Sequence, residues 1–284
     1  MGESYPTPQS VVVGFDGSRA ALDAALWAVD EAASRDIPLR LLYAIDPAGA
    51  DTRDAAHELA TAEIAVRYAF TAVEATEKPV KIEVEILQEK PARALAAASR
   101  SAAMICVGAV GLRNATRGRI GSTAAALANS AHCPVAIIRR QAVSMSTNPG
   151  AILVEVDEWP TSSAVLQCGV DEARLRGAPL RVLTTWQSRF TDVHDARAVA
   201  DGNRLAAAQL DRRLARWRRR CPDLDIASVT KHGSTLNYLA RHAASVQLVV
   251  IGCGGAGELV GPAGLAVLHD TDCSVLTCHR QQRL

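Results

Sequence analysis

A stretch rich in glycine and arginine, VGAVGLRNATRGRIGST from Val107 to Thr123, has the residue types of an anion-binding loop. Gly108 and Gly111 have no side chains, so the main-chain N–H groups beside them can approach an anion closely. Gly121-Ser122-Thr123 begins a segment with a helical pattern. The first turn of a helix offers free N–H groups and a positive dipole end, and here it also offers two hydroxyls. The stretch therefore predicts a cradle for phosphate groups.

The spacing of this loop sets it apart from two familiar phosphate motifs. Two residues separate Gly108 from Gly111, and nine separate Gly111 from Gly121. The loop is neither the P-loop G-x-x-x-x-G-K-[ST] nor the dinucleotide motif G-x-G-x-x-G. Three loop residues, Arg113, Arg117 and Arg119, can neutralise further phosphate charge, although arginines in surface loops are often only solvated.

The elements that must position this loop alternate between short β-rich runs and longer alanine-rich helical patterns. In the N-terminal half, the expected strands are Val11–Phe15, Leu39–Ile45, Lys81–Leu87, Met104–Gly108 and Val135–Arg139. The expected helices are Ser18–Ser34, Arg53–Glu74, Pro91–Ser101 and Ser122–Ala131. Such alternation predicts parallel strands joined by right-handed crossovers, and hence a doubly wound α/β domain of five strands.

The glycine loop leaves the carboxyl end of the fourth expected strand, and ligands bind at such ends in open parallel sheets. If the chain winds outward from strand one and then returns to place strand four beside it, Asp16 faces the loop. This strand order is an assumption, because spacing alone does not supply it.

The chain contains an internal repeat, which decides its architecture. Four anchors recur in the same order: an aspartate 22 residues before a proline, an Asp-Glu-Ala triplet, a leucine 13 residues before a glycine, and a glycine 12 residues before a cysteine. They are Asp16 with Pro38 and Asp157 with Pro179, Asp30–Ala32 and Asp171–Ala173, Leu95 with Gly108 and Leu239 with Gly252, and Gly121 with Cys133 and Gly261 with Cys273. We therefore expect two tandem doubly wound domains, residues 1–140 and 151–284, each a five-stranded parallel sheet flanked by helices. The polar segment 141–150 is the expected linker.

The composition is that of a soluble globular protein. Of the 284 residues, 49% are hydrophobic and 21% are charged, and the net charge of +1 shows no overall bias toward nucleic acid. No apolar run approaches the roughly 20 residues needed to cross a bilayer, and the first residues lack a signal-peptide pattern, so we expect a cytoplasmic protein without membrane contact. Seven cysteines without a Cys-x-x-Cys pair are expected to be buried in a reducing compartment.

The loop pattern G-2x-G-9x-G-[ST], together with the early VVVGFDGS, resembles the universal stress protein family, specifically its tandem two-domain kind common in actinobacteria. The resemblance covers both repeats and so nearly the whole chain. It implies an adenine nucleotide hydrolase-like fold and an adenine nucleotide, usually ATP, with or without Mg²⁺, in each competent domain. It also implies that tandem chains pair again as homodimers.

Carried over by position, the resemblance implies a set of nucleotide-binding residues in the first domain. Gly14 and Asp16 would lie against adenine and ribose, and the main chain of Ala44 would meet the adenine edge. The ribose and phosphates would be surrounded by Gly108, Gly111, Leu112, Arg113, Asn114, Gly121, Ser122 and Thr123.

The chemistry of Asp16 fits this assignment. A carboxylate accepts hydrogen bonds from ribose hydroxyls or from the adenine amino group, but it repels phosphate. We therefore expect Asp16 to lie away from the glycine cradle. The alternative is that Asp16-Gly17-Ser18 only caps the first helix.

The second copy departs from this pattern at the end of its first strand. Glu155 replaces Gly14, and Glu158-Trp159-Pro160 follows Asp157 where Gly17-Ser18 follows Asp16.

The loop of the second copy also differs. Only five residues lie between Gly255 and Gly261, the arginines are missing, and Pro262 replaces Ser122. The proline removes an amide donor and a hydroxyl, and Glu258 adds negative charge, so each change opposes phosphate binding. We expect a degenerate domain that is structural or binds a partner, with a different ligand as the alternative.

A zinc site is a rival interpretation of His269, Cys273, Cys278 and His279. An expected strand separates the two cysteines by roughly 16 Å, so they do not share one ion. The remaining His-Cys pair has too few ligands for a closed structural site, and we expect no metal there.

Two further signals have a functional and a structural interpretation. The helix-like AAAQLDRRLARWRRR, with six arginines around Trp217, could contact RNA or an acidic partner, but such runs are more often solvated helix faces. His132-Cys133-Pro134 could hold an activated thiolate, but the second copy has Asp272 in place of His132, which favours a helix end before a buried strand.

The leading hypothesis is an ATP-binding regulator or sensor of the stress response, whose conformation or choice of protein partner depends on nucleotide occupancy. The alternatives are an adenine-nucleotide hydrolase or adenylating enzyme, and a ligand-free interaction scaffold. Phosphoryl transfer needs a bound metal, positioned charge and a group that orients the nucleophile. The sequence offers no clear Mg²⁺ carboxylate beside the cradle, so binding is favoured over turnover.

Overall fold

The computed structural model describes residues 9–47, 52–112, 120–139, 150–156, 162–187, 196–252 and 273–278, together with single residues between 253 and 272. The chain divides into two compact units, the first formed mainly by residues 1–142 and the second by residues 143–278. We call them the first and second domains. Each alternates strands with helices, which confirms the predicted fold class.

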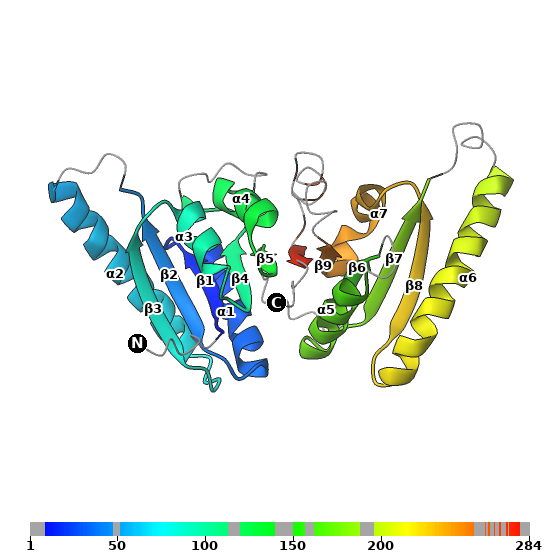
Figure 1. The fold of residues 1–284 in the computed structure, drawn as a ribbon, viewed down its shortest axis with the longest axis horizontal. Coiled ribbons are helices and arrows are strands. Elements are labelled where there is room, and N and C mark those ends of the chain that lie inside the picture. The colour runs from blue at the N-terminus through cyan, green and yellow to red at the C-terminus, as the bar shows by residue number, and fades with distance from the viewer. Residues whose placement is uncertain are drawn as a thin grey trace, which may run out of the picture. The chain divides into compact units, whose positions relative to one another are not determined.

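The described residues of the first domain form a parallel sheet and four α-helices (Figure 1). Its elements are β1 (Val11–Phe15), α1 (Arg19–Ser34), β2 (Leu39–Ile45), α2 (Thr52–Glu74), β3 (Ile82–Gln88), α3 (Pro91–Ala98), β4 (Met104–Gly108), α4 (Ser122–Ser130) and β5 (Val135–Ile138). The strands follow the order β3-β2-β1-β4-β5, and every pair is parallel.

The winding of the chain reverses between β1 and β4. The segment from β1 to β3 moves toward one edge of the sheet, and the segment from β3 to β5 returns past β1 toward the other edge. Right-handed crossovers therefore place α1 and α2, which contact each other, on one face and α3 and α4, which also contact each other, on the opposite face. The assumed strand order is confirmed, and β1 and β4 end at the point where ligands bind in such sheets.

The burial of each strand follows from its place in the sheet. The central strands β1, β4 and β5 have the sequences VVVGF, MICVG and VAII, and nearly all of their residues are buried. Continuous apolar runs are expected of parallel strands covered on both faces. The edge strand β3, IEVEILQ, is only half-buried, and two of its carboxylates, Glu83 and Glu85, lie near Arg40 of β2.

Most predicted boundaries lie within one residue of the observed ones. The largest difference in the strands and helices of the first domain is at α3, which ends at Ala98 rather than Ser101. Residues after Ala98 form tighter turns, since the N–H of Arg100 bonds to the carbonyl of Ala97. The Ser99 hydroxyl accepts a hydrogen bond from the N–H of His132 at 3.0 Å.

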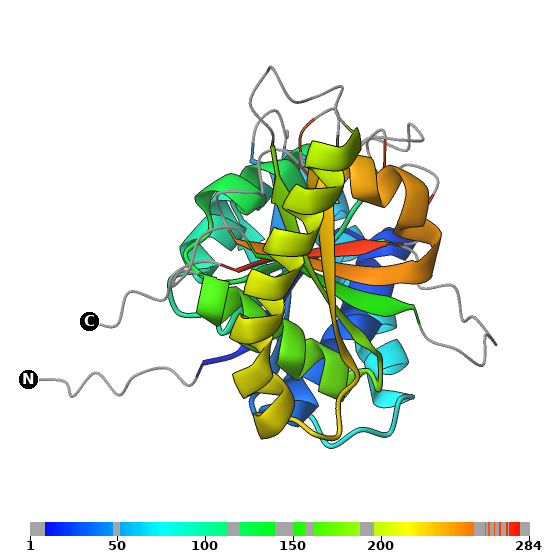
Figure 2. The same ribbon diagram turned by 90° about the vertical axis from the view of Figure 1, so that its right-hand side faces the viewer.

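The second domain repeats the topology of the first. Its elements are β6 (Ala151–Glu155), α5 (Ser162–Leu175), β7 (Leu180–Trp186), α6 (Ala196–Arg220), β8 (Ile226–His232), α7 (Thr235–His242), the 3₁₀ turn η2 (Ala243–Ser245), β9 (Val246–Gly252) and β10 (Ser274–Cys278). The parallel order is β10-β9-β6-β7-β8. Helix α6 runs along β8 (Figure 2).

Two observations bear on the environment of the chain. Among the described residues, no helix is both long enough and apolar enough to span a membrane. Five of the six described cysteines are buried, Cys168 is partly exposed, and all six are free thiols.

Candidate functional site

The carboxyl ends of β1 and β4 lie side by side, because Gly14 of β1 is the register partner of Val107 of β4. Asp16 follows β1, and Gly108 ends β4. The sheet therefore brings the carboxylate and the glycine loop together, as the sequence predicts.

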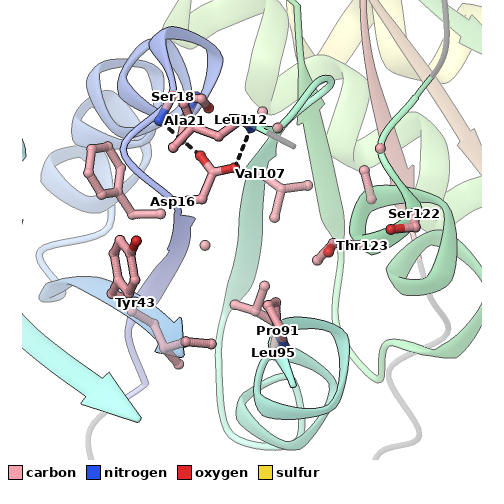
Figure 3. A pocket seen from close by; sticks show the side chains of 18 of the residues that line it. Asp16, Ser18, Ala21, Tyr43, Pro91, Leu95, Val107, Leu112, Ser122 and Thr123 are labelled. Carbon is pink, nitrogen blue, oxygen red and sulfur yellow. Dashed lines mark hydrogen bonds between the residues drawn. The ribbon is translucent and has the colours of Figure 1, made fainter. Parts of the chain in front are cut away.

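Asp16 connects the start of α1 to the start of the glycine loop. Its Oδ1 accepts a hydrogen bond from the N–H of Ser18 at 3.0 Å, and its Oδ2 accepts one from the N–H of Leu112, also at 3.0 Å (Figure 3). The prediction that Asp16 lies away from the glycine cradle is wrong, because the N–H of Leu112 at the start of the loop donates to the carboxylate. The helix cap itself belongs to Ser18, whose hydroxyl accepts from the N–H of Ala21 at 3.1 Å.

Gly108 and Gly111 lack side chains for reasons that concern the protein itself. A Cβ on Gly108 would lie 2.6 Å from the carbonyl carbon of Ala20, so glycine lets the first turn of α1 pack on β4. A Cβ on Gly111 would lie 2.7 Å from Oδ2 of Asp16, so glycine leaves room for the carboxylate. Access of an anion to the main chain, the predicted reason, is therefore not needed to explain either glycine.

Gly14 lets Leu95 of α3 pack directly against β1. A Cβ at this position would lie 2.6 Å from Cδ1 of Leu95 and 3.0 Å from Cγ1 of Val107. These two apolar side chains and Pro91 line the cavity together with Gly14. A side chain at residue 14 would therefore collide with the apolar part of the cavity lining.

Helix α4 begins with N–H groups that no side chain caps. Gly121 is the N-cap residue, and its own N–H donates to the carbonyl of Ala109 at 2.8 Å. The carbonyl of Gly121 accepts from the N–H of Ala125, so the preceding N–H groups, those of residues 122–124, have no partner within the helix. They form the positive end of the helix dipole, which favours an anion.

A cavity of about 340 Å³ joins these parts, a volume within the usual range for small-molecule sites. In Figure 3, Asp16 and Tyr43 lie on one side of it, and Ser122 and Thr123 lie on the other. Nine of the eleven predicted site residues line it: Gly14, Asp16, Ala44, Gly108, Gly111, Leu112, Gly121, Ser122 and Thr123. The other two, Arg113 and Asn114, lie outside the described residues, as do Arg117 and Arg119.

Several lining residues were not predicted, among them Tyr43, Asp46, Pro91, Leu95 and Val107. Most are apolar and lie within strands or helices, so the glycine pattern gives no sign of them. One signal was present, because Leu95 is an anchor of the internal repeat and has a fully buried counterpart, Leu239, in α7.

The corresponding place in the second domain is filled by a side chain. Glu155 is paired with Leu183 of β7 as Gly14 is paired with Leu42 of β2, so Glu155 stands at the position of Gly14. Its carboxylate accepts a hydrogen bond from the hydroxyl of buried Thr235, the first residue of α7.

Thr235 begins α7 as Pro91 begins α3, so this hydrogen bond joins the counterparts of two residues, Gly14 and Pro91, that line the cavity in the first domain. The other predicted differences of the second domain, at Asp157, Glu158, Gly255, Glu258 and Pro262, lie outside the described residues.

The thiol of Cys133 is not an activated nucleophile. The side chain is buried, and burial raises its pKa to about 12, so the thiol stays protonated at neutral pH. His132 lies near Ser99 instead, with 3.5 Å between its Nδ1 and the Ser99 hydroxyl. The structural interpretation of this tripeptide is therefore supported.

One arginine of the cluster on α6 ties the helix to the sheet. Arg218 donates from Nε to the carbonyl of Ile226 at 3.0 Å and pairs with Asp211 at 2.9 Å. The hydroxyl of Ser228 in β8 also donates to Asp211, at 2.8 Å. These two donors hold the pKa of the Asp211 carboxyl below its usual value. The guanidinium of Arg220 lies 5.8 Å from the centre of the Trp217 ring.

No group of three or more potential metal ligands gathers among the described residues. Of the four residues considered for zinc, Cys273 and Cys278 are buried at the two ends of β10, whereas His269 and His279 lie outside the described part of the chain.

Comparison with known proteins gives consistent results over the whole chain. The model of the universal stress protein family matches residues 8–139 and again residues 150–279. Universal stress protein Rv2028c of Mycobacterium tuberculosis strain H37Rv is 49% identical over 287 residues, which cover 99% of each chain. Universal stress protein Rv3134c of the same strain is 44% identical over 277 residues, covering 96% of this chain and 97% of the relative.

A solved structure shows the same fold. The crystal structure of a universal stress protein from Archaeoglobus fulgidus superposes with a TM-score of 0.67, and the match covers 97% of both chains at 14% identity.

Proposed function

Because this chain belongs to the universal stress protein family, we propose that its first domain binds an adenine nucleotide, ATP in the first instance, and that it serves as a nucleotide-dependent regulator or sensor in the stress response.

One observation carries the proposal: a single cavity has an apolar end and an anion-binding end. The apolar end, lined by Gly14, Pro91, Leu95 and Val107, suits a purine ring, and the uncapped first turn of α4 suits phosphate groups.

Asp16 also lines this cavity, and its oxygens can accept hydrogen bonds from ribose hydroxyls.

The remaining roles follow from position. The main chain of Ala44, at the end of β2, would meet the adenine edge, and the N–H groups of Ser122 and Thr123 would hold the phosphates. Arg113 and Asn114 would add donors from the loop. Mg²⁺, when it accompanies ATP, would be held mainly by the phosphates, since Asp16 and Asp46 are the only acidic side chains among the described residues that line the cavity.

The proposed output is occupancy rather than turnover. The phosphate oxygens of a bound nucleotide accept hydrogen bonds from the open N–H groups of α4. Because the nucleotide binds this conformation, it raises the population of that conformation by mass action. That conformation would then select a protein partner. We place this activity in the cytoplasm and expect the chain to form homodimers, which light scattering on the purified protein will measure directly.

The decisive experiment measures the nucleotide that copurifies with the protein. We expect ATP in wild-type protein and none in Gly121→Asp. A Cβ at Gly121 has 3.6 Å of clearance to the nearest atom, and aspartate is a favourable N-cap, so the variant should fold with unchanged or slightly higher stability. Its carboxylate would occupy the N–H groups meant for phosphate. The matched control is Gly261→Asp, the same change at the corresponding glycine of the second domain.

Equal ATP content in wild-type and Gly121→Asp protein would show that the site is wrong. Turnover is tested separately, by following release of phosphate, pyrophosphate and AMP at saturating ATP over many equivalents. Rapid multiple turnover that depends on Ser122 would replace the proposal with an enzymatic one.

A further inference from the structure

We propose that two chains of this protein associate through unlike surfaces, the outer face of α2 on one chain and a stripe of arginines on α6 of the other. The α2 face comprises Leu59, Glu63, Ile64, Tyr68 and Glu74, and the α6 stripe comprises Leu205, Arg212, Arg216 and Arg219. None of these residues lines the cavity, so the contact does not depend on nucleotide binding.

Helices α2 and α6 occupy corresponding places in the two domains. Each follows the second strand of its domain and leads to a strand at the edge of the sheet, β3 in the first domain and β8 in the second. Each helix packs on these neighbouring strands with its inner face. A difference in chemistry between the two outer faces is therefore not explained by a difference in fold.

Large apolar side chains are exposed mainly at these two edges. Among the described residues, six such side chains are exposed: three on α2, one on β3, one on α6 and one in the loop at the cavity. The exposed fraction is 72% for Ile64 and 61% for Tyr68 on α2, and it is 62% for Leu205 on α6. Apolar groups that gather on one exposed surface mark sites of contact with other proteins.

The α6 stripe runs along one side of its helix. Arg212, Arg216 and Arg219 are four and three residues apart, and Leu205 lies seven residues before Arg212, so all four share one side. All four are exposed. The helix dipole favours basic residues only in the last turn, so it does not account for Arg212 and Arg216.

The charge of the stripe is not neutralised by its own helix. The two carboxylates of α6 are already engaged, Asp201 with Arg204 and Asp211 with Arg218. Within the described part of the chain, no carboxylate pairs with the three arginines of the stripe. Their charge is therefore available to a partner.

The α2 face combines apolar and acidic side chains. Ile64 and Tyr68 are four residues apart, and Glu63 and Glu74 are eleven apart, which is about three turns. Both glutamates are exposed, and neither forms an ion pair with a described residue. Arg67 is the exposed base between them, so the face keeps a net negative charge.

The wider edges have the same opposite signs. Residues 52–90, which contain α2 and β3, include eight acidic and five basic residues. Residues 196–232, which contain α6 and β8, include four acidic and nine basic residues. The whole chain carries only +1, so its charge is segregated between the two edges.

The chemistry and the length of the two surfaces match. Arginine pairs with carboxylates and stacks on aromatic rings, and the α2 face offers two glutamates and Tyr68. The residues of each surface span roughly 21–23 Å along the helix axis.

A second copy of this chain fits both surfaces at once, because every chain carries one of each. Contact between two α6 stripes would place arginine against arginine, which is unfavourable. The association is therefore heterologous, with the first domain of one chain against the second domain of another.

The first experiment uses the wild-type chain. Sedimentation velocity measures its mass over a series of protein concentrations in about 50 mM and in about 500 mM NaCl, conditions in which the Debye length is roughly 14 Å and roughly 4 Å. We expect the mass to rise with protein concentration at low salt. The association constant should fall about tenfold or more at high salt, because salt screens the contact between oppositely charged surfaces.

The second experiment uses two complementary variants. The stripe variant carries Arg212→Glu, Arg216→Glu and Arg219→Glu, and the α2 variant carries Ile64→Lys and Tyr68→Lys. Each variant alone should associate about tenfold more weakly than wild type or worse, because every contact then contains one altered surface. An equal mixture should recover association and yield complexes that contain both variants, since each supplies the surface that the other lacks.

The matched control changes three exposed arginines outside both surfaces, Arg93→Glu, Arg100→Glu and Arg241→Glu. It should associate like wild type. Circular dichroism and thermal unfolding check that every variant folds, and the salt series on the wild type needs no variant.

Four results would overturn the inference: a wild-type chain that stays single at low salt, a stripe variant that associates as strongly as wild type, an α2 variant that does so, or a mixture that fails to recover. A single wild-type chain that binds heparin through the stripe would assign α6 to another anionic partner. A homodimer that persists in both variants would leave the expected homodimer standing and reject these surfaces. None of these outcomes depends on the nucleotide content of the protein.

Discussion

Two glycines at the same place in the two domains have different surroundings. Gly108 ends β4, and a Cβ on it would press into the main chain of α1 at Ala20. Gly252 ends β9, and among the described residues a Cβ on it would meet only Cγ2 of Val165, at an ordinary contact distance of 3.6 Å. The same residue type is therefore required by packing in one domain and permitted in the other.

A pair of alanine substitutions measures this difference. Gly108→Ala should lower the free energy of unfolding by about 1–3 kcal/mol, because α1 must move away from β4 to admit the methyl group. Gly252→Ala, the matched control, should change it by no more than about 0.5 kcal/mol. Urea denaturation of both variants checks the prediction, and equal costs would contradict the packing argument.

The reactivity of single thiols is a second prediction at this scale. Cys133 is buried with a pKa of about 12, whereas Cys168 is partly exposed, so iodoacetamide at pH 8 should label Cys168 first. Peptide mass spectrometry after timed quenching gives the order. As a control, Cys133 and Cys168 should react with iodoacetamide at similar rates in denatured protein. If Cys133 reacts as fast as Cys168 in the native protein, the result would support an activated thiolate at Cys133.

At the residue scale, the sequence pointed to nine of the twenty described residues that line the cavity but misjudged the reasons. Glycine spacing located Gly108, Gly111 and Gly121 correctly at one cavity. It did not show that the first two are fixed by contacts with Ala20 and Asp16, because such contacts join residues about 90 positions apart in the chain. Pairwise contacts of this kind leave no periodic pattern in a single sequence.

At the scale of elements, α6 shows how a charged cluster divides between structure and surface. Arg218 and Asp211 bond to each other and to β8, through Ile226 and Ser228. Other arginines of the cluster, such as Arg212, Arg216 and Arg219, are exposed. A run of arginines in the sequence does not distinguish these two roles, because the difference depends on which face of the helix meets the strand.

Removing Asp211 tests the structural part of the cluster. Asp211→Ala should lower the free energy of unfolding by about 1 kcal/mol or less at pH 7, since the pair is partly exposed. The pKa of Asp211 is lowered in the folded state, so its contribution is present above the unfolded-state value of about 3.9 and is lost as the pH falls below it. Urea denaturation between pH 7 and pH 3 should show that the difference in free energy of unfolding between wild type and Asp211→Ala becomes smaller as the pH falls. A difference that grows as the pH falls would contradict a stabilising role for the ionised carboxylate.

At the scale of the whole molecule, the two domains share a topology and differ in what fills the ends of their sheets. The repeat anchors predicted this shared architecture, since alternating strands and helices have recognisable lengths and periods. The contact between Glu155 and Thr235 was beyond such prediction, because it depends on where α7 begins relative to β6. Comparison of the two repeats in the sequence showed that Glu155 stands where the first copy has Gly14. The structure shows that Thr235 donates a hydrogen bond to Glu155.

This difference predicts one nucleotide per chain. Glu155→Ala should remove the acceptor of the buried Thr235 hydroxyl and cost about 1–3 kcal/mol of stability, while leaving the nucleotide content of the protein unchanged. Calorimetric titration gives the stoichiometry, and thermal unfolding gives the stability. Two nucleotides per chain in the wild type, or a loss of nucleotide in Glu155→Ala, would show that the second domain takes part in binding.

The unneeded glycine at the end of β9 also bears on ancestry. Gly108 is required because α1 packs against it, whereas the corresponding Gly252 has no such contact among the described residues. After a gene duplication, one copy can lose a packing constraint and still keep the residue that the constraint once required. The ancestor of both halves would then have been a single domain whose first helix pressed against a glycine at the end of its fourth strand. Among descendants of that duplication, the position of Gly252 should drift to other small residues while the position of Gly108 stays fixed.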